Sequence, residues 1–284
     1  MEENSSQRSF ELKDGKIPIF LVLRKIEDLK PHEETVPSDL QWIIKALERD
    51  PILRHPVMAD SATGALLDGT HRVAALSQMG AYSIPTALID YQNPLVKVDR
   101  WFRTISGENL RSFRKKIEKL DPFDVSPLDA DRGLIDRSTY ATLRSREQCL
   151  AFKSSDSRPL QLAKDAFRIE QIARSNGLKI AYRDNADLTD SSNASFVMST
   201  IRIEKKEVLE SCMNHNLFPP KTTRHLIPSR PLGVGAPLAW LHNRNISEAE
   251  EAFLQHLRSK NLKQLPEGSW VGSRRYLEEV FLFE

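Results

Sequence analysis

The string LLDGTHRVAAL, residues 66–76, constrains the fold of this chain more than any other part of the sequence. A short apolar segment ends at Asp68, and from Thr70 to Gly80 the apolar positions recur at helical spacing. Gly69 between them allows the sharp backbone turn by which a buried strand passes directly into a helix. The first amides of such a helix lack partners within it and carry the positive end of its dipole. This junction is therefore predicted to hold a phosphate group.

The side chains of the junction suit the same ligand. Thr70 can cap the helix or contact a phosphate, His71 adds a donor, and Arg72 adds a permanent, forked positive charge. Asp68 at the strand end can ligate Mg²⁺ or orient a reacting group, because hard cations prefer carboxylate oxygen. A structural interpretation stays open beside this one, in which Asp68 and Thr70 cap the helix and Arg72 lies on the surface.

Strand and helix patterns alternate along the whole chain, which predicts a mixed α/β (α+β) protein. Before residue 106 the predicted strands are 19–23, 56–60, 65–69, 84–91 and 97–105, and the predicted helices are 38–50 and 70–80. After it we predict a basic helix at 108–119, a loop with one helical turn at 121–137, strands at 139–145, 148–154, 179–185 and 196–203, and helices at 159–176 and 204–215. A last helix is predicted at 247–260, with Ser247 as its N-cap and Glu250 completing a capping box.

The length indicates more than one domain. At roughly 150 residues per domain, 284 residues suggest two domains, each large enough for its own core. We expect a first domain at 17–105 and a second α/β domain at 106–232, with the active site in the cleft between them. Residues 233–284 are expected to form a helical appendage.

Composition excludes several classes of protein. There are 41 basic and 39 acidic side chains, so the net charge of 41 − 39 = +2 gives no general attraction to nucleic acid. A hydrophobic content of 40% is too high for a disordered chain, and two distant cysteines exclude a disulfide scaffold or a structural zinc site. The longest apolar run, Ile17–Leu23, is far short of the ~20 residues that span a bilayer, and the polar N-terminus is no secretory signal. We therefore expect a soluble, cytoplasmic protein without a membrane partner.

The common phosphate-handling motifs are missing from the sequence. It contains no GxxxxGK[ST], no GxGxxG after a strand, and none of the catalytic strings of the protein kinases. Any phosphate chemistry must therefore use a less common device, and the strand–glycine–helix junction is the candidate.

Two further strings carry polar groups that suit a site. PHEE, residues 31–34, lies between a strand and a helix, and its simplest interpretation is an acidic turn that is favourable with the helix dipole. The loop FPPKTTRHLIP, residues 218–228, gathers two cations, two hydroxyls and an imidazole behind a pair of prolines: Lys221, Thr222, Thr223, Arg224 and His225. Such a set suits a small zwitterion that carries a carboxylate and, after reaction, a phosphate.

The junction resembles a known box. Gly69, Arg72 and Ala75 fall on the G-x-x-R-x-x-A spacing of the ParB box, so the N-terminal domain resembles the ParB/sulfiredoxin fold, whose strand-to-helix turn cradles nucleotide phosphates. Sulfiredoxins place a catalytic cysteine immediately before the histidine, where this chain has Thr70. Reduction of sulfinic acids is therefore not expected.

The P-H-E string, Trp101 and the KTTRH loop extend the resemblance to the ParB-like free L-serine kinases, from about residue 17 to residue 230. This resemblance implies that Glu33 is the general base that accepts the proton of the serine hydroxyl, with Asp68 and His71 as further catalytic residues. It also implies that Trp101 lines the serine site together with Lys221, Thr222, Thr223, Arg224 and His225.

The activity implied by the resemblance is Mg²⁺-dependent phosphorylation of L-serine to O-phospho-L-serine, with ATP or ADP as the phosphoryl donor. Asp68 would hold the metal, and the nucleotide phosphates would be bound by the junction: Gly69, Thr70, His71 and Arg72. In such relatives the product feeds the synthesis of cysteine or siderophore precursors. The choice between ATP and ADP stays open.

Two alternatives remain open at this point. Threonine or another small hydroxylated acceptor could replace serine, since one methyl group changes discrimination by only ~1–3 kcal/mol. A ParB-like, nucleotide-dependent DNA-binding protein would use the basic helix 108–119, but the small net charge and the lack of a clear helix-turn-helix argue against it. The sequence does not determine the oligomeric state.

Overall fold

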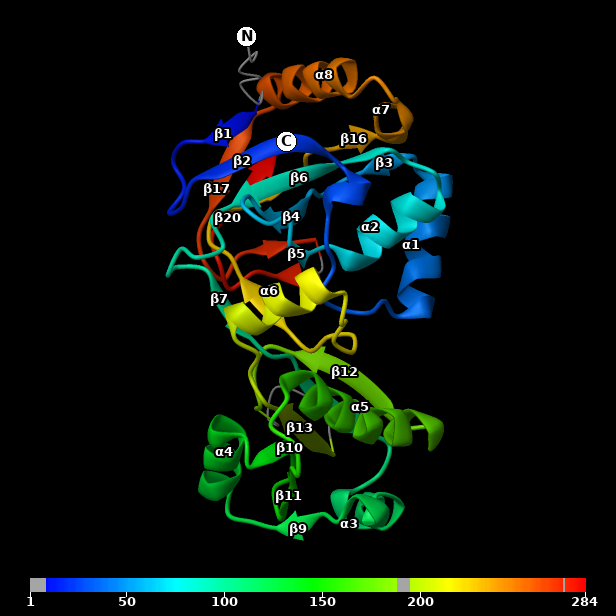
Figure 1. Cartoon of the computed structure of the whole chain (residues 1–284), viewed down its shortest axis with the longest axis vertical. Helices are drawn as coiled ribbons and strands as arrows, with labels where there is room; N and C mark the ends of the chain where they lie inside the picture. Colours follow the sequence, from blue (N-terminus) through cyan, green and yellow to red (C-terminus); the bar gives the residue numbers. More distant parts are fainter. Residues whose placement is uncertain (1–8, 188–194, 273) are drawn as a thin grey trace. The chain divides into compact units, whose positions relative to one another are not determined.

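The computed structural model describes residues 9–187, 195–272 and 274–284, which form two compact units (Figure 1). The first unit contains the chain up to Lys97 together with residues 208–215 and 225–284, and the second contains residues 98–207 and 216–224. Residues 233–284, which the sequence sets apart as an appendage, thus pack with the first unit. Helix α6 (Lys205–Asn214) and strand β14 (Arg224–Leu226) contain points at which the chain passes from one unit to the other.

A five-stranded sheet forms the centre of the first unit. Its order is β1 (Phe10–Leu12), β2 (Ile19–Lys25), β6 (Ser83–Ile89), β4 (Val57–Asp60) and β5 (Leu66–Asp68). β4 and β6 run parallel, and the other neighbouring strands run antiparallel. Every residue of β6 is buried, because this central strand is covered on both faces.

Helices and short strands complete this unit. Helices α1 (Pro37–Arg49) and α2 (Thr70–Gln78) pack against each other, and α8 (Ile246–Ser259) packs against β2 (Figure 1). The remaining elements are η1 (Ile26–Asp28), β3 (Ile52–Leu53) paired with β16 (Ala236–Pro237), α7 (Leu238–His242), the sheet of β15 (Arg230–Leu232), β20 (Val280–Phe283) and β17 (Leu262–Leu265), and the hairpin of β18 (Trp270–Val271) and β19 (Arg274–Arg275).

The predicted capping box of the last helix is wrong. Helix α8 begins at Ile246, and the side chain of Asn245 accepts a hydrogen bond from the amide of Glu248 at 3.4 Å. Asparagine is as good an N-cap as serine, and it precedes Ser247 in the chain. Ser247 is therefore a helical residue.

The second unit is built on a six-stranded antiparallel sheet. Its order is β12 (Lys179–Arg183), β8 (Phe102–Ser106), β13 (Phe196–Thr200), β10 (Thr139–Arg144), β11 (Cys149–Lys153) and β9 (Phe123–Asp124). Helix α5 (Pro159–Ser175) packs against β10 and β12, and helix α4 (Pro127–Asp136) packs against β10 and β11 (Figure 1). The predicted mixed α/β class is confirmed.

Three predicted elements of this unit need correction. The predicted loop 121–137 contains β9 and the ten-residue helix α4. Ser126 caps α4 by accepting from the amide of Asp129 at 3.1 Å, and Pro127 occupies the first turn, so residues interpreted as loop formers are a helix start signal. The predicted strand 97–105 is broken into β7 (Lys97–Asp99) and β8, and the predicted helix 108–119 is α3 (Leu110–Lys116) followed by η2 (Glu118–Leu120).

Within the described ranges, no helix combines the length and the apolar character that a membrane crossing requires.

Candidate active site

The predicted junction is present in the first unit. Strand β5 ends at Asp68, Gly69 adopts a left-handed conformation with φ 107°, and α2 begins at Thr70. A Cβ atom on Gly69 would lie 2.5 Å from Cγ1 of Val57, so only glycine fits here. Gly69 is the N-cap of α2, and no side chain of the described residues caps the helix. The interpretation in which Asp68 and Thr70 cap the helix is therefore wrong, and the phosphate site at the first amides of α2 stays a prediction.

Arg72 is anchored below this helix start. Its Nη1 donates to the carbonyl of His55 at 3.0 Å and to that of Pro56, and its Nη2 donates to Oδ2 of Asp68 at 3.0 Å. The side chain of Arg72 is only 20% exposed. Arg72 thus contributes a fixed positive charge to the junction rather than lying freely on the surface.

Asp68 lies in an ion-pair cluster that we define by Asp68, Arg72, Arg230 and Glu278. Nη1 of buried Arg230 donates to Oδ2 of Asp68 at 2.7 Å, and its Nε donates to Oε1 of Glu278 at 2.8 Å. Burial alone would oppose ionisation, but the Arg72 and Arg230 guanidiniums outweigh it and hold the pKa of Asp68 well below its ordinary value. The Asp68 carboxylate is therefore ionised near neutral pH.

These contacts bear on the predicted metal. The described residues contain no group of three or more histidine, cysteine, aspartate or glutamate side chains that could hold a metal ion. The Asp68 oxygen that faces the cluster already accepts from two guanidiniums. A metal at Asp68 would therefore need further ligands from the nucleotide phosphates, and this role of Asp68 stays a prediction.

The P-H-E loop is fastened to the same junction. Lys30 donates its amide to Gly64 at 2.9 Å and accepts from the amide of Leu66 at 2.9 Å, which places the start of the loop beside β5. His71 on the first turn of α2 accepts from the amide of Val36 through Nε2 at 2.8 Å, which holds the end of the loop. Glu33 lies between these two points and is thereby tied to the helix start.

Around Glu33 is a second group, the histidine cluster, which we define by His32, Glu33, Tyr91 and His225. His32 is 2% exposed, its Nδ1 donates to the carbonyl of Leu66 at 2.8 Å, and its Nε2 lies 3.7 Å from Oε1 of Glu33. The ring of His225 meets that of His32 edge-on at 5.3 Å, and the hydroxyl of Tyr91 lies 2.8 Å from Nε2 of His225. Burial raises the pKa of Tyr91, which keeps its hydroxyl protonated. The structure therefore brings the predicted residues Glu33, His71 and His225 together in one unit.

The other predicted substrate residues lie in the second unit. The guanidinium of Arg224 lies over the Trp101 ring at 4.9 Å, and its Nη1 lies 3.8 Å from Oδ2 of Asp184. Arg224 is buried and Trp101 is half-buried, so the tryptophan supports a cation and is not simply a core residue. Thr222 uses its hydroxyl to donate to the carbonyl of Pro219 at 2.8 Å, which stiffens the loop.

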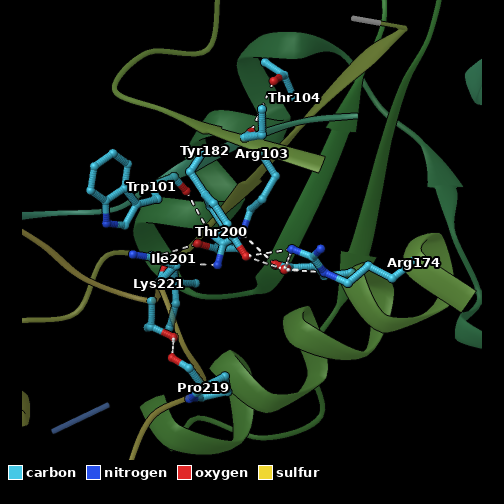
Figure 2. Close-up of polar contacts among 12 residues, drawn as sticks. Trp101, Arg103, Thr104, Arg174, Tyr182, Thr200, Ile201, Pro219 and Lys221 are labelled. Carbon is cyan, nitrogen blue, oxygen red and sulfur yellow. Dashed lines mark hydrogen bonds and ion pairs between the residues drawn. The ribbon is translucent and has the colours of Figure 1, made fainter. Parts of the chain in front are cut away.

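Arg103 links the backbone at Trp101 to the backbone at Lys221. Figure 2 shows its guanidinium donating to the carbonyls of Trp101 at 2.7 Å and Lys221 at 3.0 Å, while its Nε donates to Oε2 of Glu170 at 3.1 Å. Glu170 is 1% exposed and also accepts from Arg174 at 2.9 Å. This buried network fixes the backbone on either side of the Trp101–Arg224 contact.

The chain was compared with known proteins, and no family model matches it. The chain is 24% identical to an ATP-dependent L-serine kinase of Staphylothermus marinus over 76% of this chain and 89% of that protein. It is 26% identical to an ADP-dependent L-serine kinase of Thermococcus kodakarensis over 74% of this chain and 88% of that protein. Both relatives belong to the class that the sequence predicts.

Solved structures give the same result. A free serine kinase in complex with ADP, with one glutamate replaced by alanine, matches with a TM-score of 0.66 and 22% identity over 78% of this chain and 93% of that chain. The chain has the fold of the free serine kinases. SbnI of Staphylococcus aureus shares the fold with a TM-score of 0.65 and 17% identity over 84% of this chain and 95% of that chain. The resemblance to ParB-like serine kinases is thereby confirmed.

Sequence reasoning missed three residues that position the site: Arg103, Arg230 and Tyr91. Arg230 forms a hydrogen bond with Asp68, from which it is separated by 162 positions in the sequence. The hydroxyl of Tyr91 contacts His225, which lies 134 positions further along the chain. Arg103 lies on an alternating strand, where an inward-facing arginine predicts a buried acidic partner but does not identify it. No local pattern marks Arg230 or Tyr91.

Proposed function

We propose that this chain is a free L-serine kinase, a phosphotransferase that moves a phosphoryl group from ATP or ADP to the hydroxyl of L-serine and makes O-phospho-L-serine. The match to two curated relatives that are named L-serine kinases covers 89% and 88% of their lengths. The solved neighbours include complexes with ADP and with AMP. We place its activity in the cytoplasm.

One observation carries the proposal. The loop that contains Glu33 is fastened to the start of α2, and no side chain of the described residues caps that helix start. The first amides of α2 suit a phosphate, and His71 and Lys30 tie the loop of Glu33 to that helix and to β5. A phosphoryl donor bound at α2 and a proton acceptor at Glu33 would thereby be kept in one region of the first unit. Positioning of this kind supplies much of the catalysis of phosphoryl transfer.

Glu33 is proposed as the general base. Its carboxylate would accept the hydroxyl proton of serine as the bond between the serine oxygen and phosphorus forms. His32 donates through Nδ1 to the carbonyl of Leu66, and its Nε2 lies 3.7 Å from Oε1 of Glu33. The fixed imidazole would thereby help to hold the Glu33 carboxyl in position for the proton transfer.

The residues predicted to bind the nucleotide phosphates and serine keep those roles in this proposal. Gly69, Thr70, His71 and Arg72 would bind the nucleotide phosphates. Trp101 and the KTTRH loop, Lys221–His225, would bind serine, with Arg224 neutralising its carboxylate. Mg²⁺ would arrive on the nucleotide phosphates and neutralise their charge. Asp68 would fix Arg72 and keep the phosphate end of the site rigid.

The DNA-binding alternative gains nothing from the basic helix α3. Arg114 on that helix pairs with Asp124 at 2.6 Å, and Lys116 pairs with Glu108 at 2.6 Å. These ion pairs neutralise part of the positive charge of the helix within the protein, so less of it can attract DNA phosphates.

The test is product formation with a matrix of donors and acceptors. The purified chain is incubated with Mg²⁺, with ATP or ADP, and with serine, threonine or no acceptor, and phosphorylated amino acid is measured by mass spectrometry. We expect O-phosphoserine with at least one nucleotide, none without acceptor, and less phosphothreonine than phosphoserine. A folded protein that makes no phosphoserine with either nucleotide would disprove the proposal.

A further inference from the structure

The second unit contains a cavity of about 450 Å³ that none of the predicted kinase residues line. Its floor is one face of the sheet, formed by Phe102, Thr142, Val197 and Ser199. Thr142 and Ser199 are directly opposed in the register of β10 and β13. Leu134 of α4 closes one side. The volume is within the range of pockets that hold small organic ligands.

This face of the sheet is distinct from the face that supports the predicted serine site. Residues alternate along β8, so Phe102 faces the cavity while Arg103 points to the opposite face and reaches Glu170 of α5. The cavity and the Trp101–Arg224 group are therefore on opposite sides of one strand, and a ligand can occupy the cavity without displacing Arg103.

Arg100 brings an unusual donor to the cavity. Its guanidinium carbon lies 5.3 Å from the centre of the Phe102 ring, and its Nη1 donates to the carbonyl of Thr200. Its Nε is buried and makes no hydrogen bond to any residue that the structure describes. Arg100 is half-buried and lines the cavity, so its positive charge is partly withdrawn from water.

The side chains that line the cavity carry more positive than negative charge, which favours an anion. Four arginines line it against two acids: Arg100, Arg137, Arg144 and Arg202 against Asp131 and Glu204. Arg137 is neutralised by Glu207 at 2.6 Å, Arg144 lies 3.4 Å from Asp131, and Arg202 donates to Asp99 at 2.9 Å. In the described ranges, Arg100 alone among the four has no carboxylate within ion-pair distance.

We propose that this cavity binds a small amphipathic organic anion, whose carboxylate or phosphate accepts from Arg100 and Arg202 and whose apolar body lies on Phe102, Leu134 and Val197. The apolar side chains of Phe102, Leu134 and Val197 favour an organic ligand over an inorganic anion, since the body of the ligand removes them from water. The site is separate from the proposed kinase centre and stands whether or not the chain phosphorylates serine.

Calorimetric titration with octanoate tests the proposal, with octanamide as the uncharged probe and inorganic phosphate as the anion without an apolar body. We expect octanoate to bind more tightly than either control. Arg100→Met should weaken octanoate about tenfold or more, as expected for loss of a charge-assisted hydrogen bond. Arg146→Met, which removes an exposed arginine of the same unit outside the cavity, should leave the affinity unchanged. Equal affinity of the wild type and a folded Arg100→Met variant would overturn the proposal.

A second pair of measurements protects the test against misfolding of Arg100→Met. Ser199→Leu fills the cavity while keeping every arginine, and Arg202→Gln removes an exposed charge from its rim. Both should weaken octanoate while the far-ultraviolet circular dichroism spectrum stays that of the wild type. Full affinity in Ser199→Leu would overturn the proposal, and so would complete displacement of octanoate by ADP, which would place the probe in the nucleotide site.

Discussion

The first unit holds two groups of polar residues that differ in their chemistry. The ion-pair cluster of Asp68, Arg72, Arg230 and Glu278 consists of fixed charges joined by short hydrogen bonds. The histidine cluster of His32, Glu33, Tyr91 and His225 consists of rings, a hydroxyl and one carboxylate, with 3.7 Å between Glu33 and His32. The guanidiniums around Asp68 hold its pKa below the ordinary value, so this carboxylate keeps its charge. We therefore infer a structural role for the ion-pair cluster, whereas the proton transfer that we propose belongs to the histidine cluster.

The largest expected effect is on catalysis in the histidine cluster. Glu33→Gln keeps the shape of the side chain and removes the proton acceptor, so we expect kcat to fall by about 10²–10⁴-fold. Nucleotide affinity, measured by calorimetry with ADP, should stay within a few-fold of the wild type. Glu34→Gln is the matched control, because Glu34 is the exposed neighbouring carboxylate and has no proposed role. If Glu33→Gln retained turnover, Glu33 could not be the general base.

The ion-pair cluster should respond through stability instead. Arg230→Gln leaves Glu278 and Asp68 without the buried cation between them, and we expect the free energy of unfolding to fall by about 3–5 kcal/mol. Urea denaturation followed by circular dichroism measures this loss. Arg275→Gln, an exposed arginine of the same unit, should change stability by no more than about 0.5 kcal/mol. Equal stability of the two variants would contradict the scaffold role of the ion-pair cluster.

A smaller effect separates positioning from proton transfer within the histidine cluster. His32→Asn keeps a donor for the carbonyl of Leu66 and removes the nitrogen that faces Glu33. We expect kcat to fall about tenfold, the worth of one hydrogen bond of roughly 1.4 kcal/mol, with KM for serine little changed. His242→Asn on the exposed end of α7 is the control. A change in KM alone would show that His32 shapes the binding site and does not assist the base.

The smallest expected effect is the pH dependence of the contribution that Asp68 makes to the free energy of unfolding. The pKa of Asp68 is lower in the folded protein, so its contribution to stability is present above its unfolded pKa of about 3.9 and is lost as pH falls through the folded value. The difference in free energy of unfolding between the wild type and Asp68→Asn should therefore be largest near neutral pH and shrink in acid. A difference that stays constant between neutral pH and pH 3 would contradict this account of Asp68.

Local patterns predicted the junction because its determinants are adjacent in sequence. Gly69 must be a glycine for a steric reason, and the apolar spacing after it is helical, so strand, turn and helix could be inferred together. The KTTRH loop was predicted as a polar site for the same reason, since its prolines and charges are consecutive.

Other features depend on the folded chain. The partners of Asp68 and His225 come from distant segments, and no periodicity relates them. Helix α4 was missed because Ser126 and Pro127 were interpreted as loop residues, although both are also residues with which helices begin. The cavity beside Arg100 depends on how α4 lies on the sheet, which no string in the sequence indicates.

In the proposed mechanism, the start of α2 and the carboxylate of Glu33 form one reaction centre. A crystal structure of the chain with AMP and O-phospho-L-serine tests this arrangement. We expect the phosphoryl group at the first amides of α2 and the serine oxygen within about 3 Å of the Glu33 carboxylate. A phosphoryl group bound away from α2, or a serine oxygen out of reach of Glu33, would contradict the account.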